Sequence, residues 1–408
     1  MIRETKRQRQ RYCGSRHCYG SSTLIALVDL YLCLLVSMSM SMDIVAAAAA
    51  TESTSSTAAA PYSYNCQGRL ALVTGGTGQT GRLVTTELLR AGFCVRILTR
   101  SVSKGENIFF QMLDIDDDNR RQQLEFVEGT LGDGISVPKA FESSQRFGVD
   151  TAVSHVVFIA GGEDADFDAV NHRGVAECAK QAAKAESESM VVVSAAWVSK
   201  PYSLASLLFN SLYDDLPMSK HLQGENMLRE IGRKQHPSLN YVVLRAGRLV
   251  PDDEYPQDAA DGLWIAQDDN FAFFGPAGNP GMSQTLLAKS VVTAMKVKGK
   301  YTVQITSGSS TLPDDVTIYS TLLQDSASST LETPEEIDRW HQQAVTDFKV
   351  MFASICVGTL VLFVLLGRGW SKFFVLLSLL IVGASAWIWS VYWLNLSVAS
   401  LVALSAKK

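Results

Sequence analysis

The chain has 408 residues, of which 47% are hydrophobic, and it carries a formal net charge of −5. This length and apolar content exclude a disordered chain and predict a substantial buried core. The mild charge, with no basic run in the middle of the chain, excludes an electrostatic surface for nucleic acid. The seven cysteines and six histidines are scattered, so their spacing indicates neither a disulfide framework nor a metal site.

The N-terminal segment has the composition of a targeting sequence. Residues 1–50 combine a basic start, the apolar stretch "TLIALVDLYLCLLV" and a run of small residues, which are the parts of a secretory-type signal peptide. Residues 51–65 are rich in Ser, Thr and Ala, as in a disordered linker or in the transit part of a two-step plastid presequence. A retained signal anchor is a third interpretation.

Residues 66–312 alternate apolar runs with helical patterns. Continuous apolarity within a run predicts a strand buried on both faces, and hence a parallel sheet covered by helices. We therefore expect a doubly wound, Rossmann-like α/β domain. Its expected strands are "LALVTG", "VRILTR", "LEFVEG", "HVVFIAGG", "MVVVSAA", "NYVVLRAG" and "KYTVQITSG", and its helices include "VTTELLRAG", "GVAECAKQAAKAE" and "GENMLREIGRKQ".

The composition changes again at "LETPEEIDRWHQQAVTDFK". Thr333 can cap a helix, Pro334 suits its first position, and Glu336 stands where a capping box requires it. We expect residues 313–349 to form a polar linker and a helix.

Two uncharged runs follow, at 350–367 and, after "RGWSK", at 373–406. Because roughly 20 apolar residues cross a bilayer, these runs predict transmembrane helices at 350–367 and 373–395, with an apolar tail at 396–408. The partner of this hairpin would be membrane lipid. A buried helical hairpin of a soluble protein is the alternative.

The segment "TGGTGQTG" directly follows the first strand and precedes the first helix. In its GxxGxxG pattern, Gly75 permits the tight turn, Gly78 lets the backbone approach a pyrophosphate, and Gly81 lets the helix pack on the strand. The helix N-terminus would add free amides and a partial positive charge. The pattern predicts a dinucleotide site.

The end of the second strand indicates which dinucleotide fits. The sequence "VRILTRSVSK" offers Arg100, with Ser101 and Lys104 close by, and no acid. An acid would bind a ribose 2′-hydroxyl, whereas a guanidinium suits a 2′-phosphate. The sequence therefore favours NADP(H) over NAD(H), unless Arg100 is an ordinary solvated strand end.

These features resemble the atypical short-chain dehydrogenase/reductases of the NAD(P)H-binding, NmrA-like group. The resemblance rests on "TGGTGQTG", "VEGTLGD", "VNHRGVAECAKQAAKA", "SKHLQGENMLREIG", "LNYVVLRAGRLV" and "MSQTLLAKSVVTAM", which occur in the family's order. It implies cofactor roles for Gly75, Thr77, Gly78, Gln79, Thr80 and Gly81 at the pyrophosphate, Arg100 at the 2′-phosphate, and Ala160, Gly161 and Gly162 beside the adenosine ribose and the nicotinamide.

The same resemblance implies catalytic positions. Ser194 occupies the active-site serine position, and Lys220 resembles the lysine that contacts the nicotinamide ribose. Family members with a Tyr-x-x-x-Lys pair use the tyrosine as proton donor, but Leu216 stands four residues before Lys220 here. Tyr213, one turn further back, and Tyr202 are the tyrosines that could approach the site.

Two functions remain open. One is a membrane-anchored reductase that passes hydride from NADPH to a small, apolar, conjugated substrate such as a quinone, a flavin or a tetrapyrrole. The other is an NADP(H)-binding scaffold, sensor or assembly factor of a plastid or respiratory membrane complex. The targeting segment leaves a plastid or the endoplasmic reticulum as the expected location.

Overall fold

The computed structural model describes residues 69–112, 121–144, 146–147, 152–161, 166–256, 262–267, 269, 281–308, 316–326 and 331–365. Its helices and strands are, in chain order, β1 (Leu70–Thr74), α3 (Gln79–Arg90), β2 (Cys94–Thr99), α4 (Val102–Met112), β3 (Leu124–Glu128), α6 (Ser136–Ala140), β4 (Val153–Phe158), the π-helix η1 (Asp168–Gly174), α7 (Val175–Lys184), β5 (Ser189–Ala195), α8 (Leu204–Leu212), α9 (Pro217–Glu230), the π-helix η2 (Ile231–Gln235), β6 (Asn240–Ala246), β7 (Leu249–Val250), β8 (Gly262–Ala266), β9 (Met282–Ser283), α10 (Gln284–Ala294), β10 (Lys300–Gly308), α11 (Thr317–Ser320) and α12 (Pro334–Leu365).

The main sheet confirms the predicted Rossmann-like architecture. Its eight strands lie in the order β3-β2-β1-β4-β5-β6-β10-β8, and each neighbouring pair is parallel except β10 with β8. Every strand that the sequence predicts is present. The strand order reverses between β1 and β4, and in open α/β sheets such a reversal creates a crevice at the carboxyl ends of the strands.

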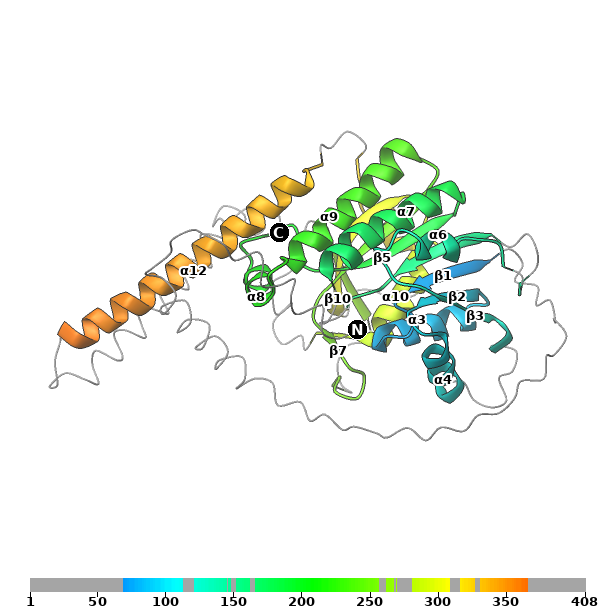
Figure 1. Ribbon diagram of the computed structural model, residues 1–408, viewed down its shortest axis with the longest axis horizontal. Coiled ribbons are helices and arrows are strands. Elements are labelled where there is room, and N and C mark those ends of the chain that lie inside the picture. The colour runs from blue at the N-terminus through cyan, green and yellow to red at the C-terminus, as the bar shows by residue number, and fades with distance from the viewer. Residues whose placement is uncertain are drawn as a thin grey trace, which may run out of the picture.

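Helices cover both faces of the sheet (Figure 1). Alternate residues of β1 serve the two faces: Leu70 and Leu72 belong to a buried cluster with α7 and α9, while Ala71 and Val73 belong to a cluster with α3 and α10. All five residues of β1 are buried. This two-sided burial explains the continuous apolar runs in the sequence, because no position of such a strand faces water.

Two features were not predicted from the sequence. The segment after β7 supplies β8, which closes the sheet edge antiparallel to β10, while β7 and β9 form a separate two-stranded sheet. Cys94, the first residue of β2, is disulfide-bonded, although the scattered cysteines indicated no disulfide framework.

The long helix α12 begins as its sequence predicts. The Thr333 N–H donates to the Glu336 carboxylate at 2.9 Å, and the Glu336 N–H donates to the Thr333 hydroxyl at 3.3 Å, which together form a capping box. Pro334 is the first helical residue. The first turns of α12 pack against α8 and α9 (Figure 1).

The docking of α12 is both apolar and polar. Ile337 and His341 are fully buried, and the Nδ1 atom of His341 lies 2.8 Å from the amide nitrogen of Asn210 in α8. Ile337 belongs to a buried cluster whose other members come from α9 and the turn after β5: Val198, Met218 and Leu222. Full burial of an aliphatic side chain of this size contributes about 1.5–3 kcal/mol. The start of α12 is therefore part of the folded domain.

Within the described residues, no helix is long and apolar enough to cross a membrane. The transmembrane helix expected at 350–367 is thus not supported: its residues continue α12 as far as Leu365, the last described residue. The second expected span at 373–395, the tail at 396–408, and the segments at 1–50 and 51–65 lie outside the described residues.

The docking of α12 predicts a pH dependence of stability. Burial lowers the pKa of His341 to about 4, against weaker opposite effects of the Val198 backbone and Asp338, whereas an unfolded histidine titrates near 6.5. Between these values the unfolded state binds more protons, so the free energy of unfolding should fall as the pH drops from about 6.5 to 4. The slope from His341 alone is at most about 1.4 kcal/mol per pH unit.

The measurement is urea unfolding of the full-length protein between pH 7 and 4.5, with His341→Asn as the comparison. The asparagine amide can still contact Asn210 but does not titrate. We expect a shallower loss of stability in the variant over this range. Identical slopes for the two proteins would show that His341 does not stay neutral beneath α12.

Candidate functional site

The glycine loop connects the end of β1 to the start of α3. Gly75 has a φ of +76°, in the left-handed region that glycine favours, and a Cβ atom there would lie 2.7 Å from the Cα atom of Ala160 after β4. A Cβ atom on Gly81 would lie 2.0 Å from the carbonyl oxygen of Gly75. The loop therefore folds back tightly onto the helix, and it lies in contact with the end of β4.

Helix α3 begins with free amide groups. Its N-cap is Gly78, which provides no side-chain cap, and the Gly78 N–H itself donates to the Gly75 carbonyl at 3.0 Å. The N–H groups of Gln79, Thr80 and Gly81 have no acceptor within the part of the chain that the structure describes, as expected for a first helical turn. Such amides, with the positive end of the helix dipole, bind anions, so this loop fits a pyrophosphate.

Arg100 lies beside this loop, at the end of the adjacent strand β2. It is exposed, and its guanidinium makes no hydrogen bond or ion pair among the described residues. The Ser101 hydroxyl accepts the Lys104 N–H at 3.4 Å at the start of α4. A Cβ atom on Gly105 would lie 3.4 Å from the Cγ2 atom of Thr77, so α4 starts next to the glycine loop. Among the described residues neither Arg100 nor Lys104 has a carboxylate partner, and two such cations fit a phosphate on the ribose.

The expected nicotinamide side follows β4. Ala160 is half-buried and lies against Gly75, and Gly161 is exposed, whereas Gly162 lies outside the described residues. Tyr213 follows α8 and meets the Phe167 ring edge-on, with 5.2 Å between the centroids. Tyr202 donates a hydrogen bond to Asp347 of α12 at 3.0 Å. Of the two tyrosines, Tyr202 therefore helps to hold α12.

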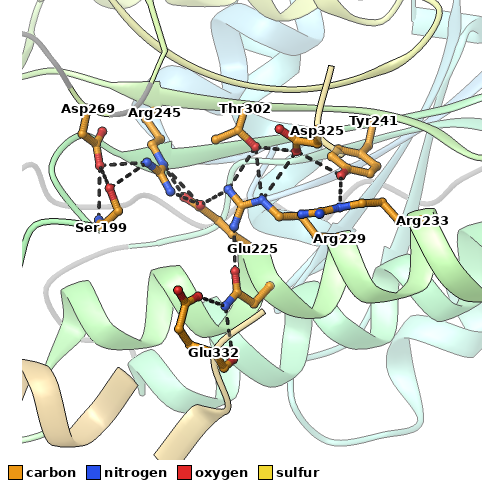
Figure 2. A network of polar contacts seen from close by, with 11 residues as sticks. Ser199, Glu225, Arg229, Arg233, Tyr241, Arg245, Asp269, Thr302, Asp325 and Glu332 are labelled. Carbon is orange, nitrogen blue, oxygen red and sulfur yellow. Dashed lines mark hydrogen bonds and ion pairs between the residues drawn. The ribbon is translucent and has the colours of Figure 1, made fainter. Parts of the chain in front are cut away.

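Ser194 lies buried at the end of β5, beside Arg245, which belongs to a network of charged groups. Figure 2 shows this network. The register partner of Ser194 on β6 is Arg245, whose Nη2 atom lies 2.7 Å from Glu225 of α9 and whose Nη1 atom lies 2.8 Å from Asp269. Among the described residues the buried Ser194 hydroxyl has no hydrogen-bond partner, but it lies close enough to Glu225 to contribute to lowering the pKa of that carboxyl.

The network continues across α9 (Figure 2). The Nη2 atom of Arg229 lies 2.8 Å from Glu225, and Asp325, after β10, accepts hydrogen bonds from Tyr241 at 3.0 Å and from Thr302 at 2.8 Å. Burial alone would raise the pKa of Glu225, but the charges of Arg245 and Arg229 hold it well below its usual range. The carboxylate therefore stays charged, and the network acts as a structural connection between α9, β6 and β10.

Lys220 is held by carboxylates of two helices. Its Nζ atom lies 2.8 and 3.0 Å from the two carboxylate oxygens of Asp338 in α12 and 3.9 Å from Asp168 at the start of η1. Burial alone would raise the pKa of Asp338, but hydrogen bonds from Lys220 and Ser219 outweigh this effect, so the pKa lies below its usual value. The structure thus places Lys220 between η1 and α12.

Several residues of this region were not identified from the sequence. Glu225 and Arg245 lie in two of the sequence segments on which the family resemblance rests. A search for residues of opposite charge on a predicted helix and on the strand that follows it could have found them. Asp269 and Asp338 carried no such signal: Asp338 is 118 positions from Lys220. His221 was not singled out either, although its Nε2 atom lies 3.2 Å from the amide nitrogen of Asn171 in η1.

Comparison with known proteins places these features in a family. Residues 75–296 match the model of a family described as NAD(P)H-binding. Among solved structures, the chain is similar to a putative NAD-dependent epimerase/dehydratase from Bacillus halodurans, with 15% identity, a TM-score of 0.42, and coverage of 62% of this chain and 100% of that one. It is also similar to a short-chain dehydrogenase/reductase from Veillonella parvula in complex with NADP, with 15% identity, a TM-score of 0.41, and coverage of 58% and 94%.

A third similar structure is the triphenylmethane reductase of Citrobacter sp. complexed with NADP(H), with 20% identity, a TM-score of 0.35, and coverage of 57% of this chain and 68% of that one. Identities this low carry no information on the substrate. A search of curated proteins finds no significant match. Since the family match spans more than half of the chain and coincides with the Rossmann-like sheet and its glycine loop, the chain belongs to the NAD(P)H-binding family.

Proposed function

We propose that the protein is an NADPH-dependent reductase acting on a small, apolar, conjugated substrate. The observation that carries this proposal concerns two neighbouring features of the described residues. Among these residues the first amides of α3, after the glycine loop, are free, and Arg100, at the end of the next strand, has no partner. The amides of Gln79, Thr80 and Gly81 would bind the pyrophosphate, and Arg100 with Lys104 would bind the 2′-phosphate. A bound reduced nicotinamide would supply a hydride at the carboxyl edge of the sheet.

The surroundings of that edge favour an apolar substrate. Helix α8 connects the end of β5 to the start of α9, so it lies at the carboxyl edge, and its side chains include Phe209 at 50% and Leu212 at 56% exposure. Tyr213 and Phe167 add two aromatic rings nearby. Exposed apolar side chains at the mouth of a site are typical of binding surfaces. A flat, conjugated molecule would find aromatic and aliphatic contacts there.

A second candidate is an NADP(H)-binding scaffold without turnover. Three observations favour it. Leu216 stands in place of the tyrosine, Ser194 is buried beside Glu225, and Lys220 forms an ion pair with Asp338.

If the protein is a reductase, we expect the purified full-length chain to oxidise NADPH in the presence of a naphthoquinone, flavin mononucleotide or a tetrapyrrole. Tight NADPH binding, measured by fluorescence, without oxidation in any of these assays would instead establish the scaffold.

The cofactor preference predicts the effect of Arg100→Glu. The change removes charge-assisted hydrogen bonds to the 2′-phosphate and adds repulsion, so the Kd for NADPH should rise about 100-fold. The Kd for NADH, which lacks this phosphate, should change by less than about threefold. Lys180→Glu, at an exposed position on α7, makes the same charge change away from β2 and should alter neither Kd. Equal affinities of the unchanged protein for NADPH and NADH would exclude the role of Arg100.

Membrane association is also a proposal, and it rests on the uncharged residues 373–406 that follow the described part of α12. The sequence of the first 65 residues supports delivery to a plastid or to the endoplasmic reticulum. The full-length chain should stay with membranes after alkaline extraction, whereas a chain ending at Leu365 should be released. Release of both chains would exclude an anchor in the C-terminal segment.

A further inference from the structure

Arg248 lies directly beyond the carboxyl end of β6, on the edge of the sheet where the glycine loop is. Ala246 is the last residue of this strand, and the Gly247 N–H still donates to the Ile305 carbonyl of β10 at 3.1 Å. Ligands of parallel sheets bind at this edge. Arg248 is exposed, so a ligand at the edge can reach its side chain.

A strip of backbone connects Arg248 to the first turn of α3. The Met282 N–H donates to the Arg248 carbonyl at 2.8 Å, and a Cβ atom on Gly281 would lie 2.7 Å from the same oxygen. Two residues after Met282, α10 begins with Gln284, whose side-chain amide donates to that of Gln79 at 3.4 Å. Two residues span at most about 7 Å. The backbone of Arg248 is therefore fixed near the helix start that would bind the pyrophosphate.

The order of the strands separates Arg248 from Arg100. Arg100 follows β2, on one side of β1, whereas β4, β5 and β6 lie on the other side. If Arg100 binds the 2′-phosphate of the adenosine half of the cofactor, the nicotinamide half extends from the glycine loop toward β4, β5 and β6. Arg248 is therefore a cation on the side of the reacting group.

The charge of Arg248 is not compensated within the described residues, where its guanidinium makes no hydrogen bond or ion pair. Asp252, the next acidic residue along the chain, instead accepts hydrogen bonds from the Thr285 hydroxyl at 2.6 Å and the Thr285 N–H at 3.1 Å. Arg245, three positions earlier, is buried and pairs with Glu225 (Figure 2). Arg245 is thus structural, whereas Arg248 presents the planar fork of donors that matches a carboxylate or a phosphate.

We propose that Arg248 determines substrate specificity by binding an anionic group, a phosphate or a carboxylate, that the conjugated substrate carries beside its ring. This inference rests on the proposed reductase function and adds an anionic group to the apolar ring of its substrate. The ring lies against the nicotinamide, and the anionic group extends from it to the guanidinium. A guanidinium forms charge-assisted and often bidentate hydrogen bonds with such groups. Arg248 binds the substrate and takes no part in the transfer of the hydride.

Two flavins with the same ring are matched probes for this role, because flavin mononucleotide carries a phosphate and riboflavin does not. Full-length protein saturated with NADP⁺ is titrated with each flavin, and binding is followed by the quenching of flavin fluorescence. We expect Arg248→Gln to raise the Kd for flavin mononucleotide about 30-fold and the Kd for riboflavin less than about twofold. Arg248→Lys keeps the charge without the planar fork, so it should weaken the binding of flavin mononucleotide less.

A control substitution and the cofactor affinity complete the test. Arg339→Gln makes the same change at an exposed position of α12, and it should alter the Kd of neither flavin. The Kd for NADPH should change by less than about twofold in Arg248→Gln, which also shows that this variant is folded.

Three results would overturn the role of Arg248: equal effects of Arg248→Gln on the two flavins, equal affinity of the unchanged protein for both, and binding of neither. A loss of NADPH affinity as large as the loss for flavin mononucleotide would assign the guanidinium to the cofactor pyrophosphate, and would overturn it too. Failure of the unchanged protein to bind NADPH would contradict the proposed function itself. NADPH binding without a preference for the phosphorylated flavin would reject only the inference about Arg248.

Discussion

The buried ion pair between Glu225 and Arg245 is the constraint on which the arrangement of the site depends. Both side chains are almost fully buried, and loss of one partner of such a pair costs about 3–5 kcal/mol, because the other charge remains without compensation. Arg245 also binds Asp269, and Arg229 joins Glu225 to the turn after β10 (Figure 2). The pair therefore fixes helix α9 on the sheet. The polar groups next to Ser194 are already engaged in this pair.

Once α9 is fixed, its other sides can serve two separate purposes. One side receives α12 through Asp338 and Ile337, and the other touches η1 through Gly224 and His221. Neighbouring residues thereby acquire different environments: Lys220 is held by carboxylates, whereas burial lowers the pKa of His221 to about 4.

The residues expected at the cofactor and those expected at the reacting group differ in how far their surroundings could be predicted. Gly75, Gly81 and Arg100 act through the local backbone and the end of one strand, so a short sequence window contains the physical information. Ser194, Lys220 and Tyr213 could be placed only on their elements, because what each contacts depends on helices from distant parts of the chain. The buried environment of Ser194 and the pairing of Lys220 with Asp338 illustrate this dependence.

The sequence by itself determined the parallel sheet, the glycine loop and the start of α12. Two-sided burial requires apolar runs, a tight turn requires Gly75, and the capping box of Thr333 and Glu336 is contained within four residues. Only the tertiary structure decided that the first turns of α12 dock on α8 and α9, and that His221 of α9 meets Asn171 of η1. Those contacts join residues 50 to 145 positions apart, and their energies come from burial and charge pairing, which local sequence patterns do not encode.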